Sequence, residues 1–225
     1  SGNWLDSIPL GEKQKRAFDS YSCVSFGALN TIEMLLKYKF GITENYSDRF
    51  LSKVSGTIRG QGNSSQNVYE AIRKFGCVPE SLWPFTEGMT EDEFFAEIPQ
   101  YVLDEGKKWL EMWDFKHEWL FYDTASLKEK QEAIKAGLLR SPVGVDVTAW
   151  FQRNGKYYKP DGTPSNHWVG GVIIGYEDQK TWLAYDSYPE SEGDFIKELE
   201  WDYPFNFAKI IYLNKKSELT PAQSS

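Results

Sequence analysis

The two halves of the sequence carry hydrophobic patterns of different period, and this difference most restricts the folds open to the chain. In the first half, apolar residues recur every three or four positions, which is typical of helices with one buried face. One helix is predicted over residues 23–39, with Ser22 as a candidate N-cap. Its apolar stripe consists of Val24, Ala28, Ile32 and Leu35. A second helix is predicted over residues 65–75, where Gly76 is the stop signal. Capping-box patterns beginning at Thr90 and Ser126 predict two further helix starts.

After Pro142 the pattern changes to short runs rich in β-branched and aromatic residues, as expected of strands. The predicted strands cover residues 143–147, 156–159, 168–175, 181–186 and 207–213. Helices followed by strands predict an α+β fold in which two lobes meet at a cleft, where an active site is expected. We expect one domain over 1–225, with a helical lobe over about 12–122, a β-rich lobe over about 123–214 and a frayed tail over 217–225.

The charge and the cysteine content exclude several classes of function. The formal net charge is -8 and the pI is about 5.0, so no basic face for nucleic acid is expected. No apolar run approaches the length of a membrane span, and no secretory signal opens the chain, so its localisation is left unknown. With two cysteines and two histidines, none of them paired at ligand spacing, we expect no metal and no cofactor. A disulfide between Cys23 and Cys77 stays open.

Cys23 is the candidate nucleophile because it directly follows the candidate cap, in the first turn of a predicted helix. Backbone N–H groups and the helix dipole at that position favour the thiolate, which is the reactive form. On position alone, however, a small buried hydrophobe is the more frequent interpretation of a lone cysteine beside an apolar stripe.

His167 and Asp186 are the candidate partners of Cys23. His167 stands between a polar loop and an apolar strand, so its ring can point into a cleft, although packing at a strand end is the alternative. Asp186 ends the next predicted strand, and a hairpin of the two strands would place its carboxylate beside His167 to orient the imidazole. An ordinary aspartate in a turn is the alternative there. His117 lies in a charged aromatic stretch and is predicted to be structural or exposed.

Three segments together resemble the papain family of cysteine peptidases. The stretch that begins Cys23-Val24-Ser25-Phe26 and reaches Glu33 resembles the catalytic helix of that family, which runs Cys-Trp-Ala-Phe-Ser. Asn166-His167, followed by an apolar run and Gly175-Tyr176, resembles its Asn/Asp-His-Ala-Val…Val-Gly-Tyr stretch. Residues 182–188 resemble its Tyr-Trp-…-Asn-Ser-Trp segment, and the separation of Cys23 and His167 falls within the family's window of about 130–150 residues. The similarity extends from about residue 14 to residue 213.

The resemblance implies a papain-like two-lobed fold, with a helical N-terminal lobe and an antiparallel, β-barrel-like C-terminal lobe. It also implies roles for individual residues: Cys23 as nucleophile, His167 as general base, Asp186 as the orienting residue and Gln14 as an oxyanion-hole donor. The substrate-binding residues that it implies are Asn63, Ser64, Ser65, Asn166 and Tyr188.

The sequence departs from the family pattern at several of these positions. The family usually has Asn where Asp186 stands, and an Asp there could stabilise the imidazolium more and shift the pH profile. Tyr188 replaces a shielding Trp, and Val24 replaces the aromatic residue after the nucleophile. The oxyanion-hole Gln normally lies six residues before the nucleophile, which is Ala17 here, so a loop must bulge to bring in Gln14. These departures suggest a divergent bacterial or phage branch.

The sequence therefore predicts a cysteine-type endopeptidase (a thiol protease, hence a hydrolase) with a catalytic triad, acting on a peptide or protein through a thioester acyl-enzyme. One alternative is another cysteine amidase, either leader-peptidase-like or a cell-wall amidase. A second alternative is an inactive papain-fold binding module. The oligomeric state stays open.

Overall fold

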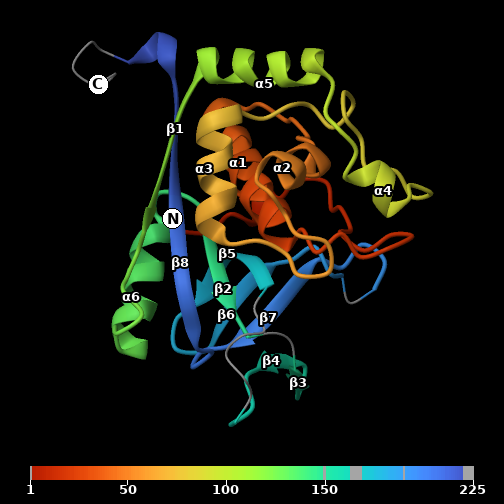
Figure 1. The fold of residues 1–225 in the computed structure, drawn as a ribbon. Helices are drawn as coiled ribbons and strands as arrows, with labels where there is room; N and C mark the ends of the chain where they lie inside the picture. The colour runs from red at the N-terminus through yellow and green to blue at the C-terminus, as the bar shows by residue number, and fades with distance from the viewer. Residues whose placement is uncertain (1, 149–150, 163–168, 190, 220–225) are drawn as a thin grey trace.

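The computed structural model describes residues 2–148, 151–162, 169–189 and 191–219. Most helices gather in one half of the molecule, and most strands lie in the other half (Figure 1). The helices are α1 (Cys23–Phe40), α2 (Asp48–Val54), α3 (Ser65–Phe75), α4 (Glu91–Phe94), α5 (Gln100–Met112) and α6 (Leu127–Leu138), with 3-10 turns η1 (Leu5–Ser7) and η2 (Lys216–Glu218) near the two ends.

Helix α1 is the central helix, and the prediction for residues 23–39 is confirmed with one residue added. Nearly every side chain from Val24 to Leu36 is buried, so this helix is enclosed on all sides and not on one stripe alone. It ends at Gly41, whose left-handed φ of 65° lets its N–H bond back to the last turn. The expected side-chain cap is wrong: Ser22 is the N-cap residue, but its hydroxyl donates to the carbonyl of Ser20 at 3.1 Å.

The other predicted helix starts are confirmed with their caps. Ser64 precedes α3 and accepts a hydrogen bond from the N–H of Asn67 at 3.2 Å. Thr90 before α4 and Ser126 before α6 both form complete capping boxes, in which a glutamate three residues later bonds back to the cap. Cap chemistry was therefore sufficient to place the starts of α4 and α6 from the sequence, whereas α3 was predicted without its Ser64 cap.

The strands form one sheet with the order β1-β8-β2-β5-β6-β7-β4-β3. Their bounds are β1 (Trp113–Trp119), β2 (Val143–Val147), β3 (Phe151–Arg153), β4 (Lys156–Tyr158), β5 (Val169–Glu177), β6 (Thr181–Tyr185), β7 (Ile196–Glu200) and β8 (Phe205–Lys215). All neighbours pair antiparallel except β4 and β7, which are parallel. Among the described residues no pairing joins β1 to β3, so the expected barrel is not confirmed. The five predicted strands are present, whereas β1, β3 and β7 were not predicted.

Strands β1 and β8 form a long ribbon that connects the two halves (Figure 1). They pair over their length, from Trp113 opposite Lys215 to Trp119 opposite Lys209. In the helical half, β8 contacts α1 and β1 contacts α3. Strand β1 thus belongs to the sheet although it precedes the expected lobe boundary near residue 122. The division into two lobes stays a prediction.

The main hydrophobic core lies where α1 packs against β2, β5 and β8. Ile32 on α1 and Val143, Val172 and Ile173 on the sheet are fully buried. Burial of each such side chain stabilises the fold by about 1.5–3 kcal/mol relative to exposure, so this contact holds α1 against the sheet. In the described part of the chain, we find no helix with the length and apolar character needed to cross a membrane.

Candidate active site

Cys23 is the first residue of α1, where the helix emerges from a loop. Its side chain is half-buried, although the following residues from Val24 to Leu29 are buried. The first turn of a helix leaves backbone N–H groups without intrahelical partners, and these favour a thiolate. Cys77 differs, because it is 3% exposed and burial raises the pKa of its thiol well above the usual range. No disulfide joins the two cysteines.

The predicted base His167 and its neighbour Asn166 lie outside the described residues, so their roles stay predictions. The expected hairpin next to them is confirmed. Strand β5, which begins at Val169, pairs antiparallel with β6, and Val172 lies opposite Tyr185. The start of β5 and the end of β6 are therefore at the same edge of the hairpin, and Asp186 directly follows that end.

Asp186 is buried, with 1% of its surface exposed. Its backbone N–H donates to the carbonyl of Phe195 at 3.0 Å, which continues the pairing of β6 with β7. Its carboxylate Oδ2 lies 3.2 Å from the Nζ of Lys197, on β7, and Lys197 is only 2% exposed. Sequence reasoning missed Lys197. The alternation from Phe195 to Glu200 was the available signal, because it places this lysine on the inward side of a strand.

Gln14 is nearly fully buried, 1% exposed, and its loop has the expected bulge. Lys15 and Asp19 form an isolated antiparallel bridge, and the N–H of Ser20 donates to the carbonyl of Gln14 at 3.2 Å. The side-chain Nε2 of Gln14 donates to Asp19 Oδ1 at 3.0 Å and to the hydroxyl of Tyr188 at 2.6 Å. Its Oε1 accepts from Ser187 at 2.7 Å. Gln14 therefore packs against the residues that follow Asp186, and its assignment to the oxyanion hole stays a prediction.

Tyr188 links the loop before α1 to the segment after β6. Its hydroxyl donates to Asp19 Oδ2 at 2.6 Å and accepts from Gln14. Burial raises the pKa of Tyr188, and the hydrogen bond to Asp19 adds to the rise. The Asp186 carboxylate raises this pKa further, as does the Cys23 thiol when it is ionised. Tyr188 thus takes part in the network around the candidate nucleophile.

The residues expected to bind substrate at the start of α3 use their side chains within the protein. Asn63 donates to the carbonyl of Ser55 at 3.0 Å, and the hydroxyl of Ser64 caps α3. Ser65 donates to the carboxylate of Asp146, at 2.9 and 3.1 Å. Ser64 and Ser65 thus form the start of α3, and their contact with substrate stays a prediction.

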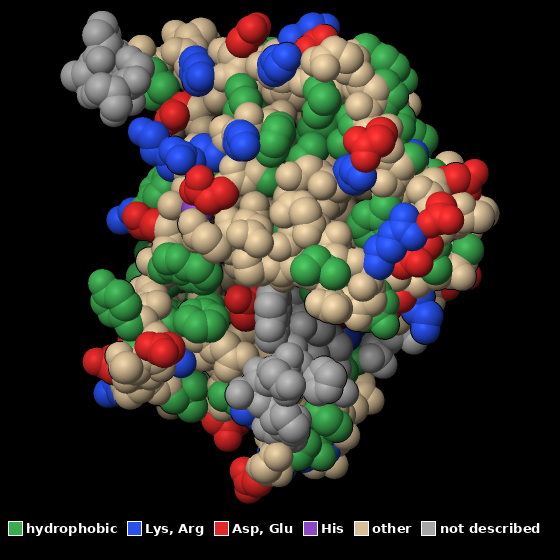
Figure 2. Space-filling view, in the orientation of Figure 1, with side chains coloured by type: hydrophobic (Ala, Val, Ile, Leu, Met, Phe, Trp, Pro, Cys, Tyr) green, Lys and Arg blue, Asp and Glu red, His purple; other side chains and the backbone are tan. Residues whose placement is uncertain are grey.

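A surface pocket of about 760 Å³ lies between α3 and the ends of β1 and β8. It is lined by Ser64, Ser65, Gln66, Trp119, Phe121, Tyr122, Asp123, Lys130, Asp146, Asn206 and Phe207. Hydrophobic side chains gather on this face where β1 ends, beside a hollow (Figure 2). Ser65, Trp119 and Asp146 also line a narrow recess that reaches Val24, the neighbour of Cys23. The pocket and the recess thus share part of their lining, and the recess reaches the helix turn that contains Cys23.

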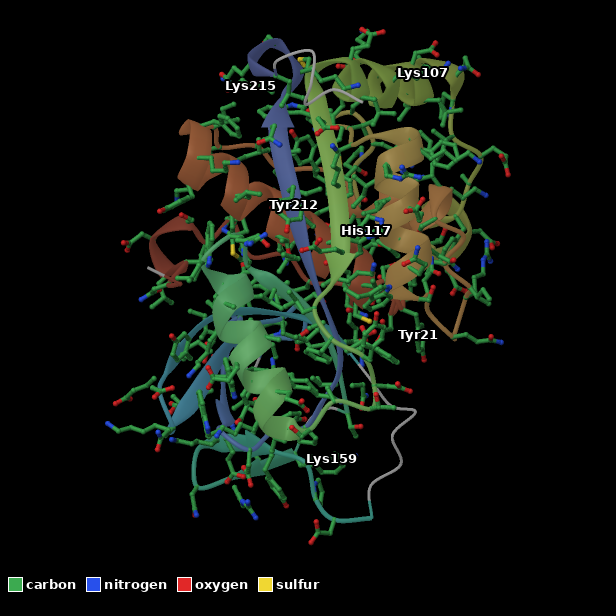
Figure 3. All side chains as sticks on the ribbon, turned by 90° about the vertical axis from the view of Figure 1, so that its left-hand side faces the viewer. Tyr21, Lys107, His117, Lys159, Tyr212 and Lys215 are labelled. Carbon is green, nitrogen blue, oxygen red and sulfur yellow. The ribbon has the colours of Figure 1, made fainter. Side chains whose placement is uncertain are left out.

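His117 has a structural position on β1, in agreement with its prediction (Figure 3). Its Nε2 lies 2.8 Å from Glu70 Oε1 on α3, and its Nδ1 lies 2.9 Å from Lys209 Nζ on β8. Burial lowers the pKa of His117, and the charge of Lys209 lowers it further. Within the described residues, no group of three or more His, Cys, Asp or Glu side chains could hold a metal ion.

Comparisons with known proteins relate this geometry to one fold. No family model and no curated protein matches the sequence. Among solved structures, the bromelain protease from Ananas comosus in complex with the E64 inhibitor matches with a TM-score of 0.64 and 17% identity, over 94% of this chain and 98% of that chain. The digestive procathepsin L 3 of the Tenebrio molitor larval midgut matches with a TM-score of 0.64 and 15% identity, over 93% and 68%. The proform of Amb a 11, a cysteine protease and ragweed pollen allergen, matches with 0.65 and 18%, over 94% and 66%.

These structural matches establish the fold. Because the identities are low, they do not identify the catalytic residues of this chain. The chain has the papain-like α+β fold, with N-terminal helices followed by a C-terminal, mainly antiparallel sheet.

Proposed function

We propose that this protein is a cysteine peptidase that hydrolyses peptide bonds with Cys23 as its nucleophile and His167 as its general base. The observation that carries the proposal is the position of Cys23: a half-exposed thiol at the first residue of the buried central helix of a papain-like fold. The burial of Asp186 and the network of Gln14 and Tyr188 around the same helix end support it.

In the proposed reaction, the Cys23 thiolate attacks the carbonyl carbon of a peptide bond while His167 is protonated. The backbone N–H of Cys23 and the side chain of Gln14 stabilise the oxyanion. His167 then gives its proton to the leaving amine, and a thioester with Cys23 remains. Water, activated by His167, hydrolyses this thioester and regenerates the thiol. Asp186 holds the imidazole in its productive tautomer and orientation throughout.

The pocket between α3 and the β1–β8 ribbon accepts a substrate side chain in this proposal. Its aromatic wall includes Trp119 and Phe207, which are 44% and 40% exposed and whose rings lie 5.6 Å apart. Exposed aromatic side chains around a concave surface are typical of binding sites. We expect the pocket to prefer apolar or aromatic side chains, which profiling with a peptide library would measure.

Site-resolved alkylation tests the nucleophile. The native protein is treated briefly with limiting iodoacetamide at about pH 6, where a thiol with a pKa near 8.5 is barely ionised. Peptide mapping then compares Cys23 with Cys77, and the same labelling in denaturant gives the rate of an unperturbed thiol for each site. We expect Cys23 to react faster than its denatured reference and to lose this advantage in His167→Ala. A native Cys23 no faster than its reference would refute the proposal.

Two alternatives are separated by the same preparations. An enzyme of the amidase type would label at Cys23 but cleave peptidoglycan fragments in preference to extended peptides. An inactive binding module would show neither labelling nor cleavage. Extended-peptide hydrolysis that disappears in Cys23→Ser is the result that we expect.

A further inference from the structure

Lys197 is a buried cation in a strand position that normally holds an apolar side chain. On β7 the buried residues are Lys197 and Leu199, which alternate with the more exposed Ile196, Glu198 and Glu200. A lysine is almost never fully buried unless it is paired. Its location inside the sheet therefore requires a partner of opposite charge.

That partner is Asp186. The Nζ of Lys197 lies 3.2 Å from Asp186 Oδ2, and the two side chains are 2% and 0% exposed. Lys197 lies opposite Ala184 in the pairing of β6 with β7, and Asp186 follows two positions later on the same face. The small side chain of Ala184 leaves room for the lysine to reach the carboxylate. Lys197 also donates a hydrogen bond to the carbonyl of Tyr188.

We propose that Lys197 is a positioning residue that neutralises the charge of Asp186, so that the catalytic histidine is oriented by an ion pair with no net charge. This inference rests on the proposed function. A single negative charge within about 4–6 Å favours the imidazolium and raises its pKa, whereas an adjacent cation opposes that effect. The pair of Asp186 and Lys197 has zero net charge, like the neutral Asn that the resemblance puts at this position. The expected shift of the pH profile by Asp186 alone is thereby reduced.

Other titratable groups lie near the pair. Tyr157 on β4 and Tyr188 after β6 contact Lys197, while Asp19 in the loop before α1 and Cys23 on α1 lie near the Tyr188 phenol. Tyr157 contributes an aromatic ring 5.7 Å from the Nζ of Lys197. Asp19 accepts hydrogen bonds from Gln14 and from Tyr188, so its charge is already engaged. Lys197 is the one cation among these described groups, so its removal changes the net charge around Asp186.

The test measures the pH profile of kcat/KM for peptide hydrolysis in four variants. In Lys197→Met the full charge of Asp186 stabilises the imidazolium, so the alkaline limb should move up by about one pH unit. In Asp186→Asn the lysine is left without its anion, so the limb should move down by about one unit. The double variant, Asp186→Asn with Lys197→Met, restores a neutral site and should return the limb most of the way to the wild type. Lys197→Arg keeps the charge and should keep the wild-type profile.

A space-filling role for Lys197 predicts different results. In that case Lys197→Met leaves the limb in place, and Asp186→Asn has the same effect with or without the lysine, which would overturn the inference. If Lys197→Met fails to fold, the comparison of Asp186→Asn with the double variant decides alone: recovery supports the inference, and no recovery overturns it. If Cys23 of the wild type labels fast but the alkaline limb does not move in Lys197→Met, the inference alone is refuted. A wild type with no labelling advantage refutes the proposed function and this inference with it.

Discussion

At the scale of single residues, Gln14 uses all the donors of its side-chain amide inside the protein. One N–H bonds to Asp19 and the other to the hydroxyl of Tyr188. An amide NH₂ has two donors, so in the oxyanion role proposed for Gln14 the substrate oxygen would replace one of these acceptors. The Tyr188 hydroxyl is the easier acceptor to replace, because it keeps its own bond to Asp19 afterwards. In that proposed role, Tyr188 holds the Gln14 amide in place until the substrate oxygen replaces it.

We expect Gln14→Ala to lower kcat by about 10²–10³-fold with a smaller change in KM, because the donor acts on charge that develops only in the transition state. Labelling of Cys23 should stay near the wild-type rate. Ser187→Ala is the matched control, since it removes the bond to Gln14 Oε1 but leaves both donors, and its loss should be much smaller. A kcat within a few-fold of the wild type in Gln14→Ala would remove this residue from the oxyanion hole.

The sequence supplied the candidate residues but not their charge environment. Cys23 and Asp186 could be predicted because a helix start and a strand end are local features with recognisable patterns. Lys197 was missed, because β7 was not predicted and the ion pair with Asp186 joins two strands. Once the sheet is known, a buried lysine becomes conspicuous, since it breaks the rule that inward strand positions are apolar.

At the scale of elements, the caps before α1 and α3 differ in a way that matters for the site. Ser22 leaves the first N–H groups of α1 without a side-chain acceptor, whereas Ser64 supplies one to α3. A bare helix start next to Cys23 keeps backbone donors available for an anion. A capped start at α3 instead fixes the residue that follows, Ser65, against Asp146.

We expect Ser64→Ala to lower the free energy of unfolding by about 1 kcal/mol and to lower kcat/KM as well, because the loosened helix start forms one wall of the pocket. Thr90→Ala is the control. It removes the same kind of cap from α4, which does not line the pocket, so a comparable loss of stability should leave kcat/KM unchanged. Urea unfolding and steady-state kinetics would measure both. Equal kinetic effects in the two variants would contradict the assignment of this wall to substrate.

Most predicted elements have local start or stop signals, whereas the missed elements β1 and α5 lack them; α2 was missed although Ser47 caps it. Strand β1 lies at the edge of the sheet and pairs only with β8 among the described strands. Its sequence is rich in charged residues and in tryptophan, which hides the strand pattern. Its partner β8 is far away in the sequence, and such long-range pairing leaves little local trace. The helix α5 begins after Pro99 with no side-chain cap bond, so no capping pattern pointed to it.

At the scale of the whole molecule, the family resemblance predicted more of the fold than secondary-structure propensity did. Hydrophobic periodicity and capping patterns located most of the helices and five strands. They could not predict the order of the strands in the sheet. The resemblance supplied the arrangement, and the match to solved papain-like structures confirms it over more than nine-tenths of the chain. The closed barrel that it also implied is not among the described pairings.

A cluster of buried carboxylates joins several parts of the helical half. Burial raises the pKa of Glu12, Glu33 and Asp48, and it raises that of Glu80 to about 8. Mutual repulsion adds to the rise, for example between Glu33 and Glu80. These groups come from the segment before α1, from α1, from α2 and from the segment before α4. Each is therefore more readily protonated in the folded chain than in the unfolded one.

This cluster predicts that the protein is more stable in mild acid. An acid whose pKa is raised on folding stabilises the fold fully below its unfolded pKa, near 4.3, and this contribution is lost as the pH rises through the folded pKa. The urea concentration at the unfolding midpoint should therefore decrease as the pH is raised from 5 to 8. The lowered pKa of His117 acts in the opposite direction. Glu80→Gln keeps an acceptor for the N–H of Phe85 but cannot ionise, so it should raise the unfolding free energy at pH 8 by about 2 kcal/mol and little at pH 5. A midpoint that rises from pH 5 to pH 8, or a Glu80→Gln variant with the same pH dependence as the wild type, would show that these carboxylates stay ionised in the folded protein.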